Sequence, residues 1–167
     1  MLTIYCTRKL AALLPEGLEK TPEATPPLYS WYANYTTIQR QKVIVAICAE
    51  TRFGFLLWNI HKADLIDFSG LILAGIRVTL RHYGVNQKVI NQYLSSDQPP
   101  KVFAATDKRA LAQVNTVILD LKYSGYLPEK QELIPFSLIE WLNDIPVISG
   151  YSKGATATEL MLEKLEE

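Results

Sequence analysis

The chain has 167 residues, of which 49% are hydrophobic and 20% are charged, as in an ordinary globular protein. Its 17 lysines and arginines balance 17 aspartates and glutamates, so the formal net charge is zero. A neutral chain argues against nucleic-acid binding driven by overall charge, although a local basic patch stays open as an alternative. We expect residues 1–167 to form a single globular domain, because a chain of this length can bury a core without a metal or a disulfide.

The sequence carries no pattern typical of export or membrane insertion. Its first residues lack the charged region and the small-residue cleavage site of a signal peptide. The most apolar run, residues 68–76, has about half of the roughly 20 residues that span a bilayer. Cys6 and Cys48 lie in predicted strands without CxxC spacing, which favours buried reduced thiols over a disulfide. We therefore expect a cytoplasmic protein that does not contact a membrane.

A strand, a short helix and a loop are predicted at the start of the chain. Residues 2–6 alternate apolar and polar side chains, as in a strand with one buried face. Thr7 can cap a helix over residues 8–14, which a proline and a glycine end. Residues 16–28 hold three prolines and little hydrophobicity, which predicts a loop.

Three strands follow in close succession, at residues 31–38, 43–49 and 53–58. The short polar turns between them are typical of an antiparallel meander. The middle strand is apolar on both faces, as in a central strand that is covered on both sides.

The rest of the chain is predicted to be mainly helical. Apolar residues recur at helical spacing over residues 62–83, and a glycine follows this long helix. The next expected elements are a helix at 87–94, a strand at 101–105, a helix at 108–124 and a helix at 136–143. In the C-terminal tail, residues 152–167, Thr156 and Glu159 form a capping box for a last helix. Its acidic end opposes the helix dipole, so we expect that end to fray.

These elements together predict an α+β fold. We expect an antiparallel sheet of four to five strands. The long helix should lie on one face of this sheet, with the further helices packed around it.

No motif in the sequence identifies a reaction. The chain lacks GxSxG, the P-loop, GxGxxG and HExxH. Its two histidines, His61 and His82, stand at opposite ends of the long helix, roughly 30 Å apart at a rise of about 1.5 Å per residue. We therefore expect no metal site and no cofactor, and no catalytic residue can be assigned.

Two cations at the start of a predicted helix form the candidate anion site. Lys108 and Arg109 occupy the first turn, where each positive charge opposes the helix dipole by about 0.3–1 kcal/mol. Sequences tend to break local rules where function demands it, and a helix N-terminus with two cations could hold phosphate or a carboxylate. The alternative is that both side chains extend into water, with Asp107 compensating their charge.

The aromatic segment YSWYANY, at the start of the strand 31–38, allows two interpretations. Alternation along an edge strand places Trp31 and Tyr35 in the core and turns Tyr32 and Asn34 outward. One interpretation is core packing. The other is a platform that stacks nucleic-acid bases, beside Arg40 and Lys42 in the next turn. The aromatic rings and those cations stand at opposite ends of the strand, which favours packing.

The order of these features resembles a family of short standalone bacterial proteins that is classed as a domain of unknown function. The resemblance covers residues 1–151. It rests on the opening LTIYCTRKL, a W-x-A-N segment at 31–34, a turn and strand at 50–55, a basic helix start at 108–115, and Asn-x-x-Pro at 143–146 followed by Gly150 and Tyr151. At the helix start the family is richer in Ser, Gly and Asp, whereas this chain has Ala110, Ala112 and Thr116.

The resemblance implies no known reaction, but it does imply that several of these residues share one site. They are Trp31, Asn34, Lys108, Arg109, Asn115 and Asn143. The primary anion-site candidates are Lys108, Arg109, Asn34 and Asn115, and the secondary candidates are Trp31, Tyr32, Glu50 and Asn143.

Neutral charge and missing catalytic motifs favour a binding or interaction protein inside the cell. The alternative is an enzyme or toxin-like component that acts on a phosphate-bearing substrate such as nucleic acid. It would hold the anion with Lys108, Arg109, Asn34 and Asn115, and would use Glu50 or a histidine as a general base. A third hypothesis is a homo-oligomer that buries an apolar face, since Tyr and Trp are abundant. The sequence identifies no other partner.

Overall fold

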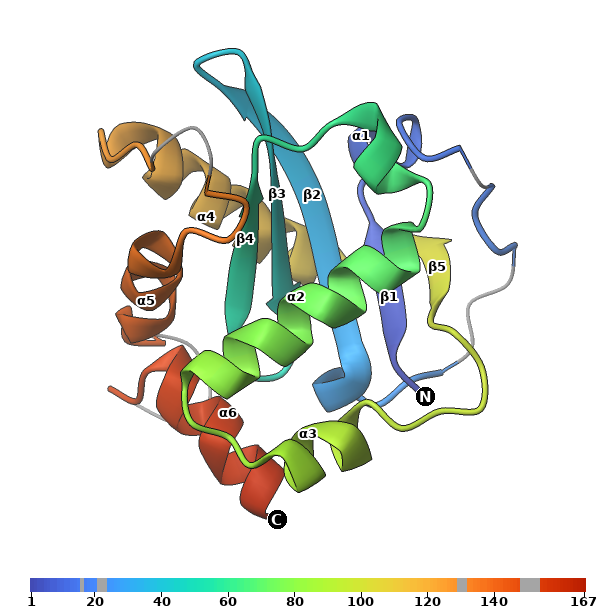
Figure 1. Ribbon diagram of the computed structural model, residues 1–167, viewed down its shortest axis with the longest axis vertical. Coiled ribbons are helices and arrows are strands. Elements are labelled where there is room, and N and C mark those ends of the chain that lie inside the picture. Colours follow the sequence, from blue (N-terminus) through green and yellow to red (C-terminus); the bar gives the residue numbers. More distant parts are fainter. Residues whose placement is uncertain (16, 21–23, 129–131, 148–153) are drawn as a thin grey trace.

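A mixed five-stranded sheet lies at the centre of the molecule (Figure 1). The computed structural model describes residues 1–15, 17–20, 24–128, 132–147 and 154–167. The strands are β1 (Thr3–Cys6), β2 (Ser30–Ile38), β3 (Gln41–Cys48), β4 (Gly54–Trp58) and β5 (Lys101–Ala104). Their order in the sheet is β4-β3-β2-β1-β5.

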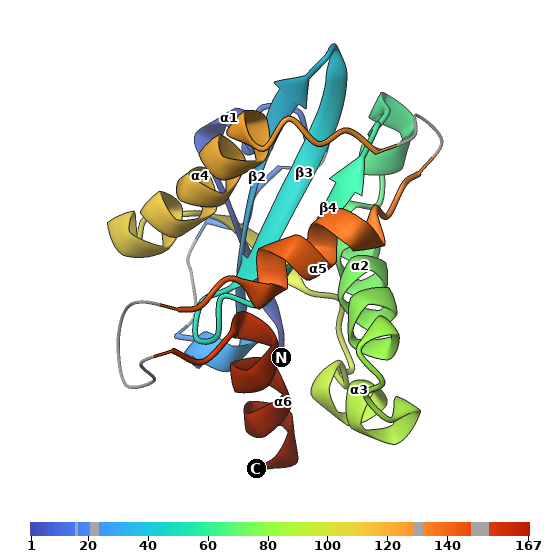
Figure 2. The ribbon, with the colours of Figure 1, turned by 90° about the vertical axis from the view of Figure 1, so that its left-hand side faces the viewer.

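The helices of the described residues surround this sheet. They are α1 (Arg8–Ala11), α2 (Phe68–His82), α3 (Gln87–Tyr93), α4 (Lys108–Tyr123), α5 (Phe136–Asp144) and α6 (Ala157–Glu166). Short 3-10 helices occupy Pro27–Tyr29 and Lys62–Leu65. The predicted α+β class is thereby confirmed, with helices on both faces of the sheet (Figure 2).

The direction of β1 differs from the prediction. The strands β2, β3 and β4 form the expected antiparallel meander, but β1 runs parallel to both β2 and β5. The prediction of a purely antiparallel sheet is therefore wrong. Parallel neighbours need a crossover of a dozen or more residues, and the segments 7–29 and 59–100 are long enough to provide one.

The middle position of β2 changes the burial of its aromatic segment. Trp31 is fully buried, and Tyr32 and Asn34 are each only 8% exposed. The prediction that Tyr32 and Asn34 point outward is wrong, because β2 is not an edge strand and α4 covers its second face. Tyr35 is half-buried, with the Lys9 ammonium 4.5 Å from the centre of its ring.

Helix α2 crosses one face of the sheet (Figure 1). It approaches closely at Gly75, where an added Cβ would lie 2.2 Å from the Phe55 ring. The long helix predicted over 62–83 is interrupted after a 3-10 turn. Asp67 then caps α2 by accepting a hydrogen bond of 3.0 Å from the Gly70 amide. The Asp67 carboxylate therefore begins α2 as its N-cap.

Helix α4 crosses the opposite face and packs on β2 and β3 (Figure 2). Its buried residues are Ala110, Val114, Ile118 and Leu121, which recur three or four positions apart and so form one apolar stripe. Helix α5 lies along β4, the outer strand of the meander, and α6 packs against α5. The cleft described below is bounded by α4, the β3–β4 turn and the ends of α5 and α6.

Some predictions fall outside the described residues. They concern residues 16 and 21–23 of the loop, residues 152–153 of the tail, and Gly150 and Tyr151 of the family motif. In the part of the chain that the structure describes, none of the helices combines the length and the apolar character needed to cross a lipid bilayer.

Candidate functional site

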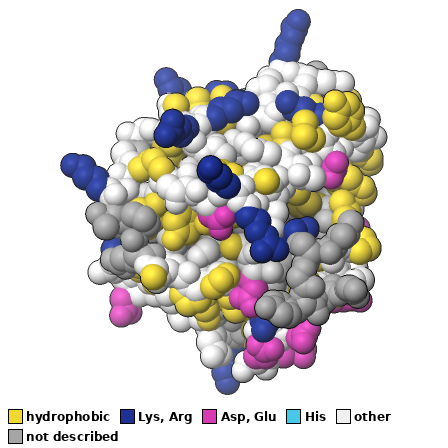
Figure 3. All heavy atoms as spheres, turned by 180° about the vertical axis from the view of Figure 1, so that it is seen from behind, with side chains coloured by type: hydrophobic (Ala, Val, Ile, Leu, Met, Phe, Trp, Pro, Cys, Tyr) yellow, Lys and Arg dark blue, Asp and Glu magenta, His cyan; other side chains and the backbone are white. Residues whose placement is uncertain are grey.

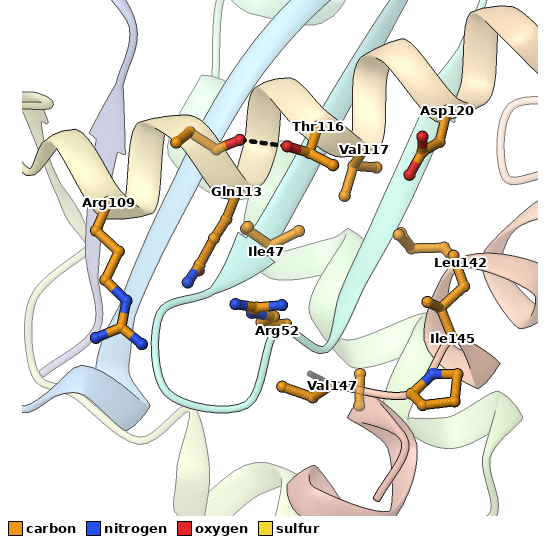
Figure 4. A pocket seen from close by; sticks show the side chains of 13 residues that line it. Ile47, Arg52, Arg109, Gln113, Thr116, Val117, Asp120, Leu142, Ile145 and Val147 are labelled. Carbon is orange, nitrogen blue, oxygen red and sulfur yellow. Dashed lines mark hydrogen bonds between the residues drawn. The ribbon is translucent and has the colours of Figure 1, made fainter. Parts of the chain in front are cut away.

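A cleft lies between the first half of α4 and the turn that joins β3 to β4 (Figure 4). One part is a pocket of about 320 Å³, bounded by α4, by Ile47 of β3 and by the end of α5. The adjoining part reaches the aromatic side chains of β1 and β2. Four side chains line both parts and so stand where the two parts meet: Arg52, Arg109, Gln113 and Val147.

The two arginines reach the cleft from different elements. Arg109 extends from the first turn of α4, and Arg52 from the β3–β4 turn (Figure 4). Partial burial, followed by the positive charge of Arg109, lowers the pKa of Arg52 from its ordinary value. Within the described residues, the Arg109 guanidinium makes no hydrogen bond or ion pair. An anion between the two groups would offset their repulsion and accept charge-assisted hydrogen bonds.

The β3–β4 turn fixes the position of Arg52. Its φ of +61° lies in the left-handed region, which is uncommon for a residue with a side chain. Backbone hydrogen bonds hold it there: the Arg52 amide donates to the Cys48 carbonyl at 3.0 Å, and the Cys48 amide donates to the Phe53 carbonyl at 2.8 Å. The Thr51 hydroxyl accepts from the Phe53 amide at 3.2 Å. A strained, well-bonded turn therefore presents a guanidinium to the cleft.

One stripe of α4 forms the opposite wall. Arg109, Gln113, Thr116 and Asp120 recur three or four positions apart, so they share one side of the helix (Figure 4). The charge changes along the stripe from a cation to an anion over roughly 16 Å, at about 1.5 Å per residue. Val117 and the apolar side chains of the facing elements line the pocket between these two ends.

Gln113 leaves a polar group unsatisfied at the centre of this wall. Its Oε1 is buried and has no hydrogen-bond partner among the described residues. Buried polar atoms without a partner are rare in folded proteins, and this oxygen can accept a hydrogen bond from water or another donor but not from a carboxylate. The amide thus adds a polar group to the two guanidinium groups.

The structure joins two of the predicted site residues, Asn34 and Asn115, but not at this cleft. The Asn34 Nδ2 donates to the Asn115 Oδ1 at 2.9 Å. The Asn34 Oδ1 accepts from the Thr7 hydroxyl at 2.6 Å and from the Tyr35 amide at 2.8 Å. These bonds connect the start of α1 to β2 and α4, so the two asparagines have a structural role.

The two cations that were predicted to hold one anion together do not both line the cleft. Arg109 lines the cleft, whereas Lys108 is exposed and does not line it. The carboxylate of Asp107 accepts from the Arg109 amide at 2.8 Å and from the Ala110 amide at 3.3 Å. The amides at this helix start are therefore already capped, and an anion would meet the Arg109 side chain rather than the backbone.

Two secondary candidates are buried in structural roles. The Trp31 indole donates to the Tyr93 hydroxyl at 2.9 Å and packs on Phe55, on the α2 face of the sheet. Asn143 is fully buried and exchanges two hydrogen bonds of 2.8 Å with the backbone of Gly54. Neither side chain lines the cleft.

The groups considered as a general base lie apart from one another. Glu50 lines the cleft, and its carboxylate is 3.7 Å from the Lys164 ammonium. His82 instead pairs with Glu140 at 2.7 Å, between α2 and α5. Within the described residues, no three His, Cys, Asp or Glu side chains gather as a metal ion would require.

The sequence profile of the family described as "Domain of unknown function (DUF6933)" matches residues 3–160. The chain belongs to this family. Neither the curated proteins nor the solved structures that were compared contain a significant match. Membership confirms the resemblance to a domain of unknown function, and the proposed bacterial source stays a prediction.

In this DUF6933 domain, sequence reasoning missed Arg52 and Gln113. Gln113 could have been identified from the sequence, because it lies four residues after Arg109, beside the apolar stripe of α4. Arg52 lies in the short turn ETR, where nothing local distinguishes it from a solvated cation. Its partner in the cleft is 57 positions away, and only the packing of α4 on β3 brings them together.

Tyr32, a secondary candidate, forms part of the aromatic side of the cleft. Its ring stacks on Tyr5 with centroids 4.9 Å apart. Burial, with smaller contributions from Asp107 and Tyr5, raises the pKa of Tyr32 from 10.0 to about 12. The environment of Tyr32 therefore strongly favours the neutral phenol.

This pKa predicts a loss of stability in alkaline solution. The unfolded state releases the Tyr32 proton near pH 10, whereas the folded state retains it until about pH 12. The stabilisation is thus complete below pH 10 and is lost as the pH rises through this window. We expect urea unfolding of Tyr32→Phe to depend less on pH between 10 and 12 than that of the wild type. A tyrosinate absorbance titration that assigns Tyr32 a pKa near 10 would contradict this expectation.

Proposed function

We propose that this protein binds a small anionic ligand in the cleft, between Arg52 and Arg109. The observation that carries the proposal is the convergence of these two guanidinium groups, from separate elements, on one concave site. Guanidinium groups match carboxylate and phosphate oxygens, and their mutual repulsion makes an anion favourable between them. A cytoplasmic location belongs to this proposal, supported by two buried free cysteines.

A small molecule fits this site better than a nucleic acid. The pocket is concave and lined mainly by apolar side chains, as small-molecule sites are. Nucleic acid would need cations that follow a phosphate backbone across a surface. The face seen in Figure 3 instead mixes lysines and arginines with hydrophobic groups, and Asp and Glu gather at one end. The zero net charge agrees with this choice.

Binding without catalysis is supported by the arrangement of the remaining groups. Asn34 and Asn115 satisfy each other and are not directed at the cleft. Glu50, the carboxylate that could act as a base, faces Lys164. An enzyme that acts on a phosphate-bearing substrate stays the alternative, and it would use the same two arginines.

The test measures the affinity of inorganic phosphate by phosphorus NMR line broadening. We expect Arg109→Gln and Arg52→Asn each to weaken binding about tenfold or more, because a hydrogen bond to a charged group contributes roughly 1.5–3 kcal/mol. Asparagine suits position 52 because it tolerates a positive φ. Both variants should keep the folded circular-dichroism spectrum.

Lys108→Gln is the matched control. It removes the same charge from the same helical turn, at a side chain that does not line the cleft. We expect its phosphate affinity to stay within about twofold of the wild type, since an exposed charge that does not touch the ligand acts only through screened solvent. Equal losses in Lys108→Gln and Arg109→Gln would show that net charge, not the cleft, attracts phosphate. No binding at all would reject the proposal.

A further inference from the structure

The pocket beside the two arginines has a shape and a lining that an inorganic anion would leave empty. It encloses about 320 Å³, within the range of sites that bind small organic molecules. Its wall between α4 and the end of α5 is formed by Ile47, Val117, Leu142, Ile145 and Val147. These side chains come from three different segments and line the same pocket (Figure 4).

The charged groups lie at the two ends of this apolar wall. Arg52 and Arg109 stand at one end, and the Gln113 side chain lines the pocket beside them. Asp120 lines the other end, about three turns along α4. The Thr116 hydroxyl, between them, already donates to the Ala112 carbonyl at 2.9 Å. One end thus accepts an anion, the middle accepts an apolar body, and the far end disfavours a second anion.

Deepening the function proposed above, we infer that the ligand is an amphiphile with an anionic head group at one end only, carried by an apolar chain or ring. The head lies between Arg52 and Arg109, and the apolar body fills the pocket between α4 and α5. The head is a carboxylate or a phosphate monoester, which share the oxygen geometry that guanidinium groups bind. Asp120 makes the site selective against dianions that carry a charge at each end.

Isothermal titration with straight-chain carboxylates tests the apolar body. Affinity should rise about fourfold for each added methylene from butanoate to octanoate, because each buried methylene contributes about 0.8 kcal/mol. Octanoate and octyl phosphate identify the preferred head group. Octanol, which lacks the charge, should bind about tenfold more weakly or worse. Octanedioate should also bind more weakly than octanoate, and Asp120→Asn should reduce that difference.

A variant that fills the pocket separates this inference from the proposed function. Ala112 lines the pocket from an exposed position on α4, so Ala112→Phe should place a ring in the pocket and leave the fold intact. We expect Ala112→Phe to retain phosphate binding and to lose the dependence on chain length. Val78→Ala, on the α2 face, is a control that should keep that dependence.

The outcomes are distinct. If phosphate binds through the arginines but chain length has no effect in the wild type, the inference fails and the proposed function stands. A chain-length effect that persists in Ala112→Phe, or octanol binding as tightly as octanoate, also overturns the inference. If neither phosphate nor any carboxylate binds, or if binding ignores Arg52→Asn and Arg109→Gln, both fail.

Discussion

Replacing Asn143 with alanine is expected to lower the free energy of unfolding by about 3 kcal/mol. Asn143 is fully buried on α5, and its amide donates to the Gly54 carbonyl and accepts from the Gly54 amide, each at 2.8 Å. Without it, both backbone groups stay buried under α5 without partners, and each costs roughly 1–3 kcal/mol. Chemical denaturation monitored by circular dichroism measures the effect.

Asn143→Leu separates the hydrogen bonds from the volume of the side chain. Leucine fills a similar space but cannot donate to or accept from Gly54, so this variant should lose most of the same stability. Its phosphate affinity, measured below the unfolding transition, should equal that of the wild type, because Asn143 does not line the cleft. A stable Asn143→Leu protein would show that packing, not hydrogen bonding, is what Asn143 contributes.

Asn143 illustrates how the fold protects an exposed strand edge. β4 is the outer strand of the meander, and its unpaired backbone groups could pair with another chain. The Asn143 amide pairs with one end of β4, and the Leu133 carbonyl accepts from the Trp58 amide at 2.8 Å at the other end. Gly54 also leaves room here, because a Cβ would lie 2.6 Å from the Ala46 carbonyl oxygen. The segments around α5 therefore supply hydrogen-bond partners at both ends of β4.

Much of the local structure could be predicted from the sequence, because local signals decide it. Thr156 and Glu159 form the predicted capping box of α6, and the apolar stripe of α4 faces the sheet. The direction of β1 could not be predicted, since its parallel pairing depends on where two long connections return to the sheet. The burial of Tyr32 follows from that same topology, which places β2 in the middle.

In the candidate site, too, local signals reveal some residues, whereas only the packing of distant segments reveals others. The sequence pointed to Arg109 as a candidate because two cations at a helix start break a local rule, and its side chain lines the cleft. No local pattern pointed to Arg52, because its neighbour in the cleft comes from a distant segment. Asn34 and Asn115 were predicted to share a site and do contact each other, yet their contact joins elements of the fold and does not line the cleft. Polar residues in a pattern can thus mark a structural bridge as readily as a binding site.

Replacing Gly75 with alanine is expected to destabilise the protein by about 1–3 kcal/mol, although alanine favours helices. Gly75 lies in the middle of α2, where alanine by itself would add roughly 1 kcal/mol of stability. Its Cβ, however, would lie 2.2 Å from Cε2 and 2.6 Å from Cζ of Phe55. The ring is fully buried and packs on Trp31, so it cannot move away without disturbing the core. Thermal and urea unfolding measure the change.

Ala74→Gly, at the exposed neighbouring position, measures the helix preference alone and should cost about 1 kcal/mol. Combining Gly75→Ala with Phe55→Leu should recover part of the loss, because the smaller side chain leaves room for the methyl group. The double-mutant cycle should therefore give a favourable coupling of about 1 kcal/mol. If Gly75→Ala instead raised the melting temperature, helix preference would outweigh the contact with Phe55. The close approach of α2 to β4 would then not require glycine.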